Sequence, residues 1–205
     1  MAHFTGKTYP LDSLILNGCN GISGPGVRQL LTAFNDTLID FEAALNDQPI
    51  FSSAFFDMLG HCFNLETLDV TGSNGIDDEG IRQLTAVAIT VGNDTVKPGL
   101  KYCHTLKMSN AKITDAVLPS LVKCMPNLEH VELCKCEGLG EFGIGKLLSD
   151  CEQLIYLDIN KVPIVNYGFL DELKNSKPDL LIRRNVHQDD DFKKDNGLRV
   201  PRRII

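Results

Sequence analysis

The chain has 205 residues, of which 43% are hydrophobic, so it is long enough to form one domain with a sizeable core. Its formal net charge of −7 argues against nucleic acid as the default partner, because binding to a phosphate backbone needs a basic surface. No apolar stretch approaches the length of a membrane span, and the first residues lack the apolar core of a signal peptide. We therefore expect a cytoplasmic protein, in the cytosol or on the cytoskeleton, with the nucleus not excluded.

The first periodic unit begins at Leu11, after a lead-in of residues 1–10. Its alternating apolar residues predict a short strand, and the residues that follow fit a turn and a helix with one apolar side. A closely similar unit begins at Leu65, which lies two periods of about 27 residues further along. The turn segments NGISGPGVRQL and NGIDDEGIRQL match most closely. Self-similarity at such a period predicts a stack of repeats.

A degenerate unit lies between these two, with Leu38, Phe41 and Ala43 at the strand positions. After the third unit, which starts at Leu65, the next strand is delayed to Cys103, well beyond one period. The excess of about eleven residues falls on a polar segment that contains glycine and proline. We expect a longer surface loop near residues 92–99.

The later units are regular, with Leu128, Leu154 and Leu180 following Cys103 at a period of about 26 residues. Leu180 starts the last strand, so the repeat domain is predicted to cover residues 11–184. Residues 185–205 are charged and out of register, and we interpret them as a C-terminal arm. Its basic clusters predict either contact with an acidic surface, such as tubulin or RNA, or a solvated terminus.

The repeat pattern, with leucines at a strand, a turn cysteine and a helix that closes in Cys-x-x-Leu, resembles the cysteine-containing leucine-rich repeat of F-box/LRR proteins. The best matches are Leu11–Val27, Leu65–Leu84 and Leu128–Cys151. The resemblance implies an α/β fold, a right-handed solenoid or horseshoe of about six repeats, with parallel strands on the concave side and helices on the convex side. In that family the repeats usually hold a protein partner. An F-box would be a helical segment before the repeats, and the ten residues that precede Leu11 do not contain one.

If the strand leucines point inward, the residues between them face the concave surface. The residues that we predict to bind a partner there are Asp40, Glu42, Thr67, Asp69, Lys107, His130, Glu132, Tyr156 and Asp158. Carboxylates dominate this set, and a parallel sheet would align them in a band. The band predicts docking of a basic segment of another protein, with Tyr156 and Ile15 as anchors. The alternative is an acidic face that is only solvated.

Catalytic and metal sites are less well supported. Cys134 and Cys136 with His130 could suggest zinc, but Ser109 and Asn160, expected on the flanking strands, cannot complete a set of ligands. His61–Cys62 and His104–Cys103 are adjacent pairs, whose side chains point in different directions on a strand or helix, so they do not form a catalytic dyad. We expect no enzyme activity, no cofactor and no metal.

The function expected from these features is a protein-interaction module or scaffold subunit of a larger assembly. Relatives with this repeat type also occur among ciliary axoneme components, so the resemblance keeps a cytoskeletal or ciliary assembly in view. The alternative is the substrate-recognition part of an SCF-type ubiquitin ligase adaptor. The expected partner is a protein with a basic segment, whereas a membrane or a nucleic acid is not expected.

Overall fold

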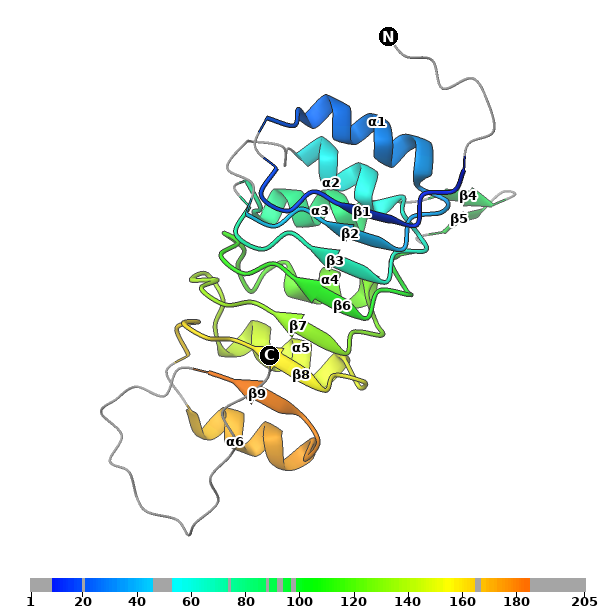
Figure 1. The fold of residues 1–205 in the computed structure, drawn as a ribbon. Coiled ribbons are helices and arrows are strands. Elements are labelled where there is room, and N and C mark those ends of the chain that lie inside the picture. The colour runs from blue at the N-terminus through cyan, green and yellow to red at the C-terminus, as the bar shows by residue number, and fades with distance from the viewer. Residues whose placement is uncertain are drawn as a thin grey trace.

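The computed structural model describes residues 9–19, 21–45, 53–73, 75–87, 89–91, 94–96, 99–164 and 167–184. Strands and helices alternate along the chain (Figure 1). The elements are β1 (Ser13–Ile15), α1 (Gly24–Phe34), β2 (Asp40–Glu42), α2 (Ser53–Gly60), β3 (Thr67–Asp69), α3 (Asp78–Ala86), β4 (Ile89–Val91), β5 (Asp94–Val96), β6 (Thr105–Lys107), α4 (Leu118–Cys124), β7 (His130–Glu132), α5 (Glu141–Asp150), β8 (Tyr156–Asp158), α6 (Tyr167–Ser176) and β9 (Leu181–Arg183).

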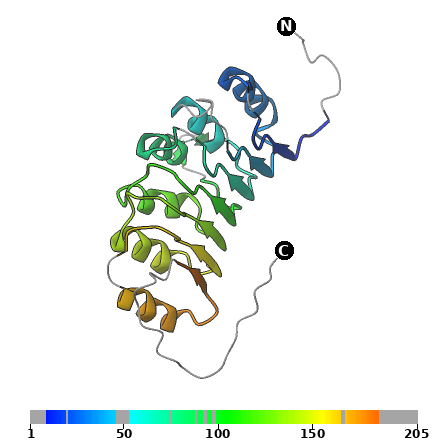
Figure 2. The same cartoon turned by 60° about the vertical axis from the view of Figure 1, so that its left-hand side comes forward.

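Seven of the strands form one parallel sheet in the order β1-β2-β3-β6-β7-β8-β9. Because this order follows the sequence, each strand–helix unit adds one strand beside the previous one, as in a solenoid. The stack is curved, with the strands on its inner side and the helices on its outer side (Figure 2). The predicted α/β alternation with a parallel sheet is confirmed. We call the sheet face turned away from the helices the inner face.

The middle residue of each strand points into the core, toward the helices. These residues are register partners from strand to strand, and the row runs Leu14, Phe41, Leu68, Leu106, Val131, Leu157 and Ile182. The members between the two ends are fully buried, whereas Leu14 and Ile182 are half-buried. Each strand needs only three residues because one inward side chain between two outward ones is enough to place it in the stack.

A left-handed residue stands three positions after each of the strands β1, β2, β3, β6, β7 and β8. Its φ lies between 58° and 68° at Gly18, Leu45, Gly72, Asn110, Lys135 and Lys161. At the first five positions the backbone N–H donates to a carbonyl of the next unit at 2.7–2.8 Å. These inter-unit hydrogen bonds stabilise the left-handed backbone conformation. Leu45 and Lys135 can therefore occupy positions at which glycine and asparagine are normally favoured.

Alanine at Gly72 tests this ladder of turns. The φ of Gly72 is 67°, and an added Cβ would lie 2.8 Å from Leu45 Cδ2, whereas at Gly18 it would meet no atom within 4 Å. We expect each of Gly18→Ala and Gly72→Ala to lower the free energy of unfolding by about 1 kcal/mol from backbone strain, because the exposed Leu45 side chain can turn away from the Cβ at position 72. Urea unfolding of both variants measures the losses, and no loss in either variant would contradict the strain.

Side chains also join neighbouring units at both corners of the stack. At the turn after the strand, the Ser73 hydroxyl donates to the Ala43 carbonyl oxygen at 2.6 Å, and the Cys136 thiol lies 3.5 Å from the Met108 carbonyl oxygen. At the opposite corner, the Asn64 side chain donates to the Asp36 carbonyl oxygen and the Asn127 side chain to that of Lys101, both at 2.7 Å. The repeat-related polar residues therefore satisfy backbone groups that the short strands leave unpaired.

The sequence predicts that the recurring Gly26, Gly80 and Gly143 serve a tight strand-to-helix connection. Gly80 and Gly143 instead lie in the first turns of α3 and α5. A Cβ on Gly80 would lie 2.7 Å from the Phe56 ring of α2, and one on Gly143 would meet the Asp115 carboxylate and lie 2.8 Å from Leu118 Cδ1 of α4. These two glycines therefore allow neighbouring units to approach closely.

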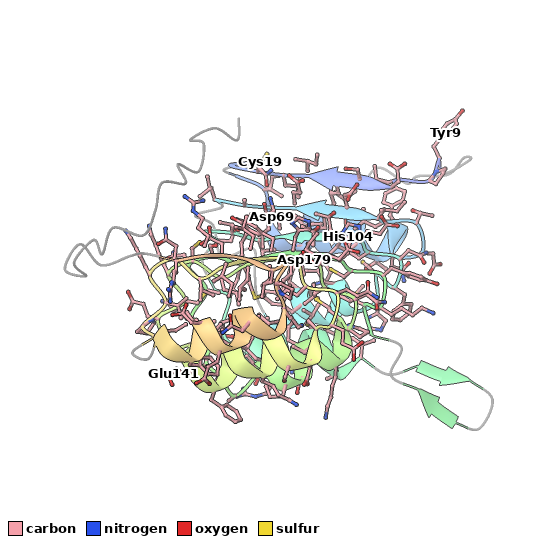
Figure 3. All side chains as sticks on the ribbon, turned by 90° about the horizontal axis from the view of Figure 1, so that it is seen from below. Tyr9, Cys19, Asp69, His104, Glu141 and Asp179 are labelled. Carbon is pink, nitrogen blue, oxygen red and sulfur yellow. The ribbon has the colours of Figure 1, made fainter. Side chains whose placement is uncertain are left out.

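The predicted long loop contains regular structure. Strands β4 and β5 pair antiparallel, with Ile89 opposite Val96. The hairpin projects from the body of the stack (Figure 3). Residues 92–93 and 97–98 of that loop, as well as residues 1–8 of the lead-in and the whole arm of residues 185–205, lie outside the described residues.

Candidate functional site

The inner face presents two rows of side chains, from the first and the third residue of every strand. The first row runs Ser13, Asp40, Thr67, Thr105, His130, Tyr156 and Leu181. The second row runs Ile15, Glu42, Asp69, Lys107, Glu132, Asp158 and Arg183. The structure thus brings together on one sheet face every residue that the sequence predicted to bind a partner.

The N-terminal half of the inner face carries three carboxylates, Asp40, Glu42 and Asp69, which we call the acidic patch. Glu42 and Asp69 are register partners on β2 and β3, and Asp40 belongs to β2. Within the described residues, no Lys, Arg or His nitrogen lies within 4.0 Å of these carboxylates. Like charges on neighbouring strands repel, so a bound cation would relieve a local cost.

Two members of the acidic patch also have local hydrogen-bonding roles. The Asn17 side chain donates to Glu42 Oε2 at 2.7 Å, and the Thr71 backbone N–H donates to Asp69 Oδ1 at 2.9 Å. The second bond is an Asx-type turn that ends β3. Replacements that test the charge must therefore keep an oxygen acceptor at both positions.

The centre of the inner face is close to neutral. Lys107 Nζ lies 3.5 Å from Glu132 Oε1, and the two residues are register partners on β6 and β7. Both side chains are about one third exposed (37% and 32%), so the pair contributes little to stability. The Lys107–Glu132 pair lies between the acidic patch and the C-terminal strands β8 and β9 of the inner face.

Asp158 differs from the open, solvated carboxylate that the sequence predicted, because it is only 3% exposed. Arg183 Nη1 lies 3.4 Å from Asp158 Oδ2, and the Asn160 backbone N–H donates to Asp158 Oδ1 at 3.0 Å. The Tyr156 hydroxyl donates to Asp158 Oδ2 at 3.5 Å. Asp158 is thus buried within the fold and paired with Arg183 of β9.

The C-terminal half of the inner face forms an open groove with a volume of about 1060 Å³. We call this the apolar groove. Leu181 and Ile155 expose 56% and 46% of their surfaces, and the rings of His130 and Tyr156 stack with centroids 5.9 Å apart. Burial raises the pKa of the Tyr156 hydroxyl, and an interaction with Arg183 opposes part of that rise. Exposed large apolar side chains grouped beside aromatic rings are typical of binding sites.

Sequence reasoning missed Ile155, Leu181 and Arg183, which line this groove. Leu181 and Arg183 lie on β9, in register with Tyr156 and Asp158. The signal was present for these two, since each stands close to one repeat period after its register partner. Arg183 is followed by Arg184 and the charged arm, and this run of charges concealed its place on the strand.

Five of the seven cysteines are buried in the core, at positions 62, 103, 124, 136 and 151. Burial raises the pKa of the Cys62 and Cys103 thiols to about 12, which disfavours the thiolate that nucleophilic chemistry needs. The neighbouring ring nitrogens face elsewhere: His61 Nδ1 lies 2.9 Å from the Asp57 carbonyl oxygen and His104 Nδ1 lies 3.0 Å from Thr105 Oγ1. In the part of the chain that the structure describes, no three His, Cys, Asp or Glu side chains are grouped so as to hold a metal ion.

No model of a known protein family matches this chain. None of the helices in the described segments is long and apolar enough to cross a membrane. A function can be inferred from the inner face, which combines an acidic patch, a neutral centre and an apolar groove. Figure 3 shows Asp69 and His104 on the strand side of the molecule, with Glu141 on the helix side.

Proposed function

We propose that this protein is a leucine-rich-repeat interaction module, a non-catalytic scaffold subunit that binds a basic segment of a partner protein on its inner face. The repeat motif and the parallel strands in sequence order support this type of solenoid. In repeat proteins of this kind, the concave sheet is an extended binding surface that a partner can follow over several units.

One observation carries the proposal: the acidic patch lies on the sheet face without helices and has no cation within 4.0 Å among the described residues. Elsewhere the stack does pair its charges, for example Arg82 with Glu79 at 3.1 Å and Lys146 with Asp150 at 2.8 Å. Carboxylates concentrated on a concave surface attract a basic segment and orient it during approach.

The test neutralises the patch without removing its hydrogen bonds. The variant D40N/E42Q/D69N keeps the oxygen acceptors that Asn17 and Thr71 use. The probe is a fluorescent 12-residue peptide with alternating Lys/Arg and Ser, titrated against the full chain at about 0.1 M salt, where the Debye length is about 10 Å, and followed by anisotropy. We expect the dissociation constant to rise at least about 10-fold, from roughly 0.5 kcal/mol per lost charge contact.

The matched control is E137Q/E152Q/E172Q, which changes the net charge by the same amount at exposed carboxylates away from the inner face. We expect its dissociation constant to stay within about 3-fold of the parent, because screening weakens charges beyond a Debye length. Equal losses in the two variants would mean that the peptide responds only to net charge, and the proposal would fail.

A further inference from the structure

We propose that the inner face recognises a two-part segment of its partner: a basic cluster on the acidic patch and, about five residues away, an apolar or aromatic side chain in the apolar groove. This inference rests on the proposed function and adds to it the composition and the spacing of the bound segment. It follows from the different chemistry of the two halves of the inner face.

The apolar groove has the properties of an anchor site. Leu181 and Ile155 are among the few large apolar side chains of the described chain that stay exposed, whereas the repeat leucines are buried. Covering them would remove apolar surface from water, which stabilises the complex by roughly 25 cal/mol for each Å² of apolar surface buried. The face of Tyr156, already stacked with His130, offers a flat wall against which an incoming ring can pack.

The charges around the groove favour a neutral occupant. Lys107, Glu132 and Arg183 line it, and each cation is paired with a carboxylate of the inner face, Glu132 or Asp158. A lysine or arginine of the partner placed here would find each of these carboxylates already paired with a cation. The acidic patch has no cation within ion-pair distance among the described residues, so basic residues of the partner are directed there.

The strand order fixes the distance between the two parts. The acidic patch lies on β2 and β3, whereas the groove extends from β6 to β9 and its aromatic side chain Tyr156 lies on β8. At about 4.8 Å per strand step, the centre of the patch and Tyr156 are about 17 Å apart. An extended peptide covers about 3.3 Å per residue, so about five residues span that distance.

Synthetic peptides test the spacing on the full chain. Each peptide has three basic residues and a Phe-Leu pair in a Ser/Thr background, separated by five residues or by one, and each is made in both orders. We expect a five-residue peptide to bind at least about 10-fold more tightly than its one-residue counterpart, because the shorter one cannot reach both sites at once. The variant I155S/L181S should abolish this preference while retaining binding to the basic 12-residue peptide.

The outcomes separate the two proposals. Equal affinity for both spacings, together with no effect of I155S/L181S, overturns the two-part inference, while weakening by D40N/E42Q/D69N would still support the acidic patch. If D40N/E42Q/D69N also binds every peptide normally, the proposed function fails. The parent chain could also self-associate in sedimentation experiments, and D40N/E42Q/D69N could abolish that self-association. This result would assign the inner face to a second copy of the chain and would also overturn the inference.

Discussion

Replacing Phe41 with alanine lowers the free energy of unfolding by about 3–5 kcal/mol in urea titrations, the largest effect that we expect from a single substitution in this chain. Phe41 is fully buried, and its ring centroid lies 5.7 Å from that of Phe55. Phe55 in turn meets Phe56 edge to face, also at 5.7 Å. Truncation would remove one wall of this three-ring cluster and leave a cavity between β2 and α2 that the short elements cannot close.

Two further variants define the cause. Phe41→Leu restores the residue found at the equivalent positions 14 and 68, and we expect it to cost only about 1 kcal/mol because most of the volume remains. Ile15→Ala changes an exposed side chain on the neighbouring strand and should cost no more than about 0.5 kcal/mol. A loss below about 1 kcal/mol for Phe41→Ala would show that the cluster is not packed as described.

Alkaline pH destabilises the protein through its buried thiols. Burial raises the pKa of Cys62, helped by Asp36, and that of Cys103 to about 12, and it raises the pKa of Cys136 and Cys151 to about 11. In the unfolded chain a thiol releases its proton near pH 8.5–9. Above that pH the unfolded state binds fewer protons than the folded state, so stability is complete below about pH 8.5 and is lost as pH rises toward 11–12.

The measurement is urea unfolding under reducing conditions at about pH 8 and about pH 10, and the four thiols together should remove on the order of 5 kcal/mol between these values. Cys103→Ala and Cys151→Ala each remove one of these four thiols and should reduce the loss of stability between the two pH values by about 1 kcal/mol. The remaining groups are common to parent and variants, so their contributions cancel in the comparison. Identical slopes in all three proteins would contradict the assignment.

The repeat period predicted the positions of the strands well. Leu14, Leu68, Val131 and Leu157, three residues after the unit starts Leu11, Leu65, Leu128 and Leu154, lie in one inward-pointing row in parallel register. Even the degenerate second unit was correctly aligned through Phe41. The prediction succeeded because each short strand needs one inward apolar side chain. That residue can be recognised within the sequence of a single repeat.

The chemistry of the inner face was predicted only in part. The sequence placed Asp158 and Asp69 in equivalent roles, yet Asp158 is 3% exposed and is paired with Arg183, whereas Asp69 lies in the acidic patch. Each aspartate has a cation as its register partner on the following strand, Lys107 for Asp69 and Arg183 for Asp158. The difference is that Lys107 pairs with Glu132 on the far side, at 3.5 Å, whereas Arg183 pairs with Asp158 itself, at 3.4 Å.

The sequence by itself determined the period, the alternation of strand and helix, the buried row and the excess of carboxylates among the outward residues. Only the tertiary structure decided that Leu181 of the predicted last strand lines the groove and that Arg183 pairs with Asp158, that the segment after α3 forms a hairpin, and that the glycines at 80 and 143 allow close approach of neighbouring units. The physical reason is range. Periodicity acts within one unit and is visible in its residues, whereas exposure, charge pairing and close approach depend on adjacent units, a whole repeat period away in the chain.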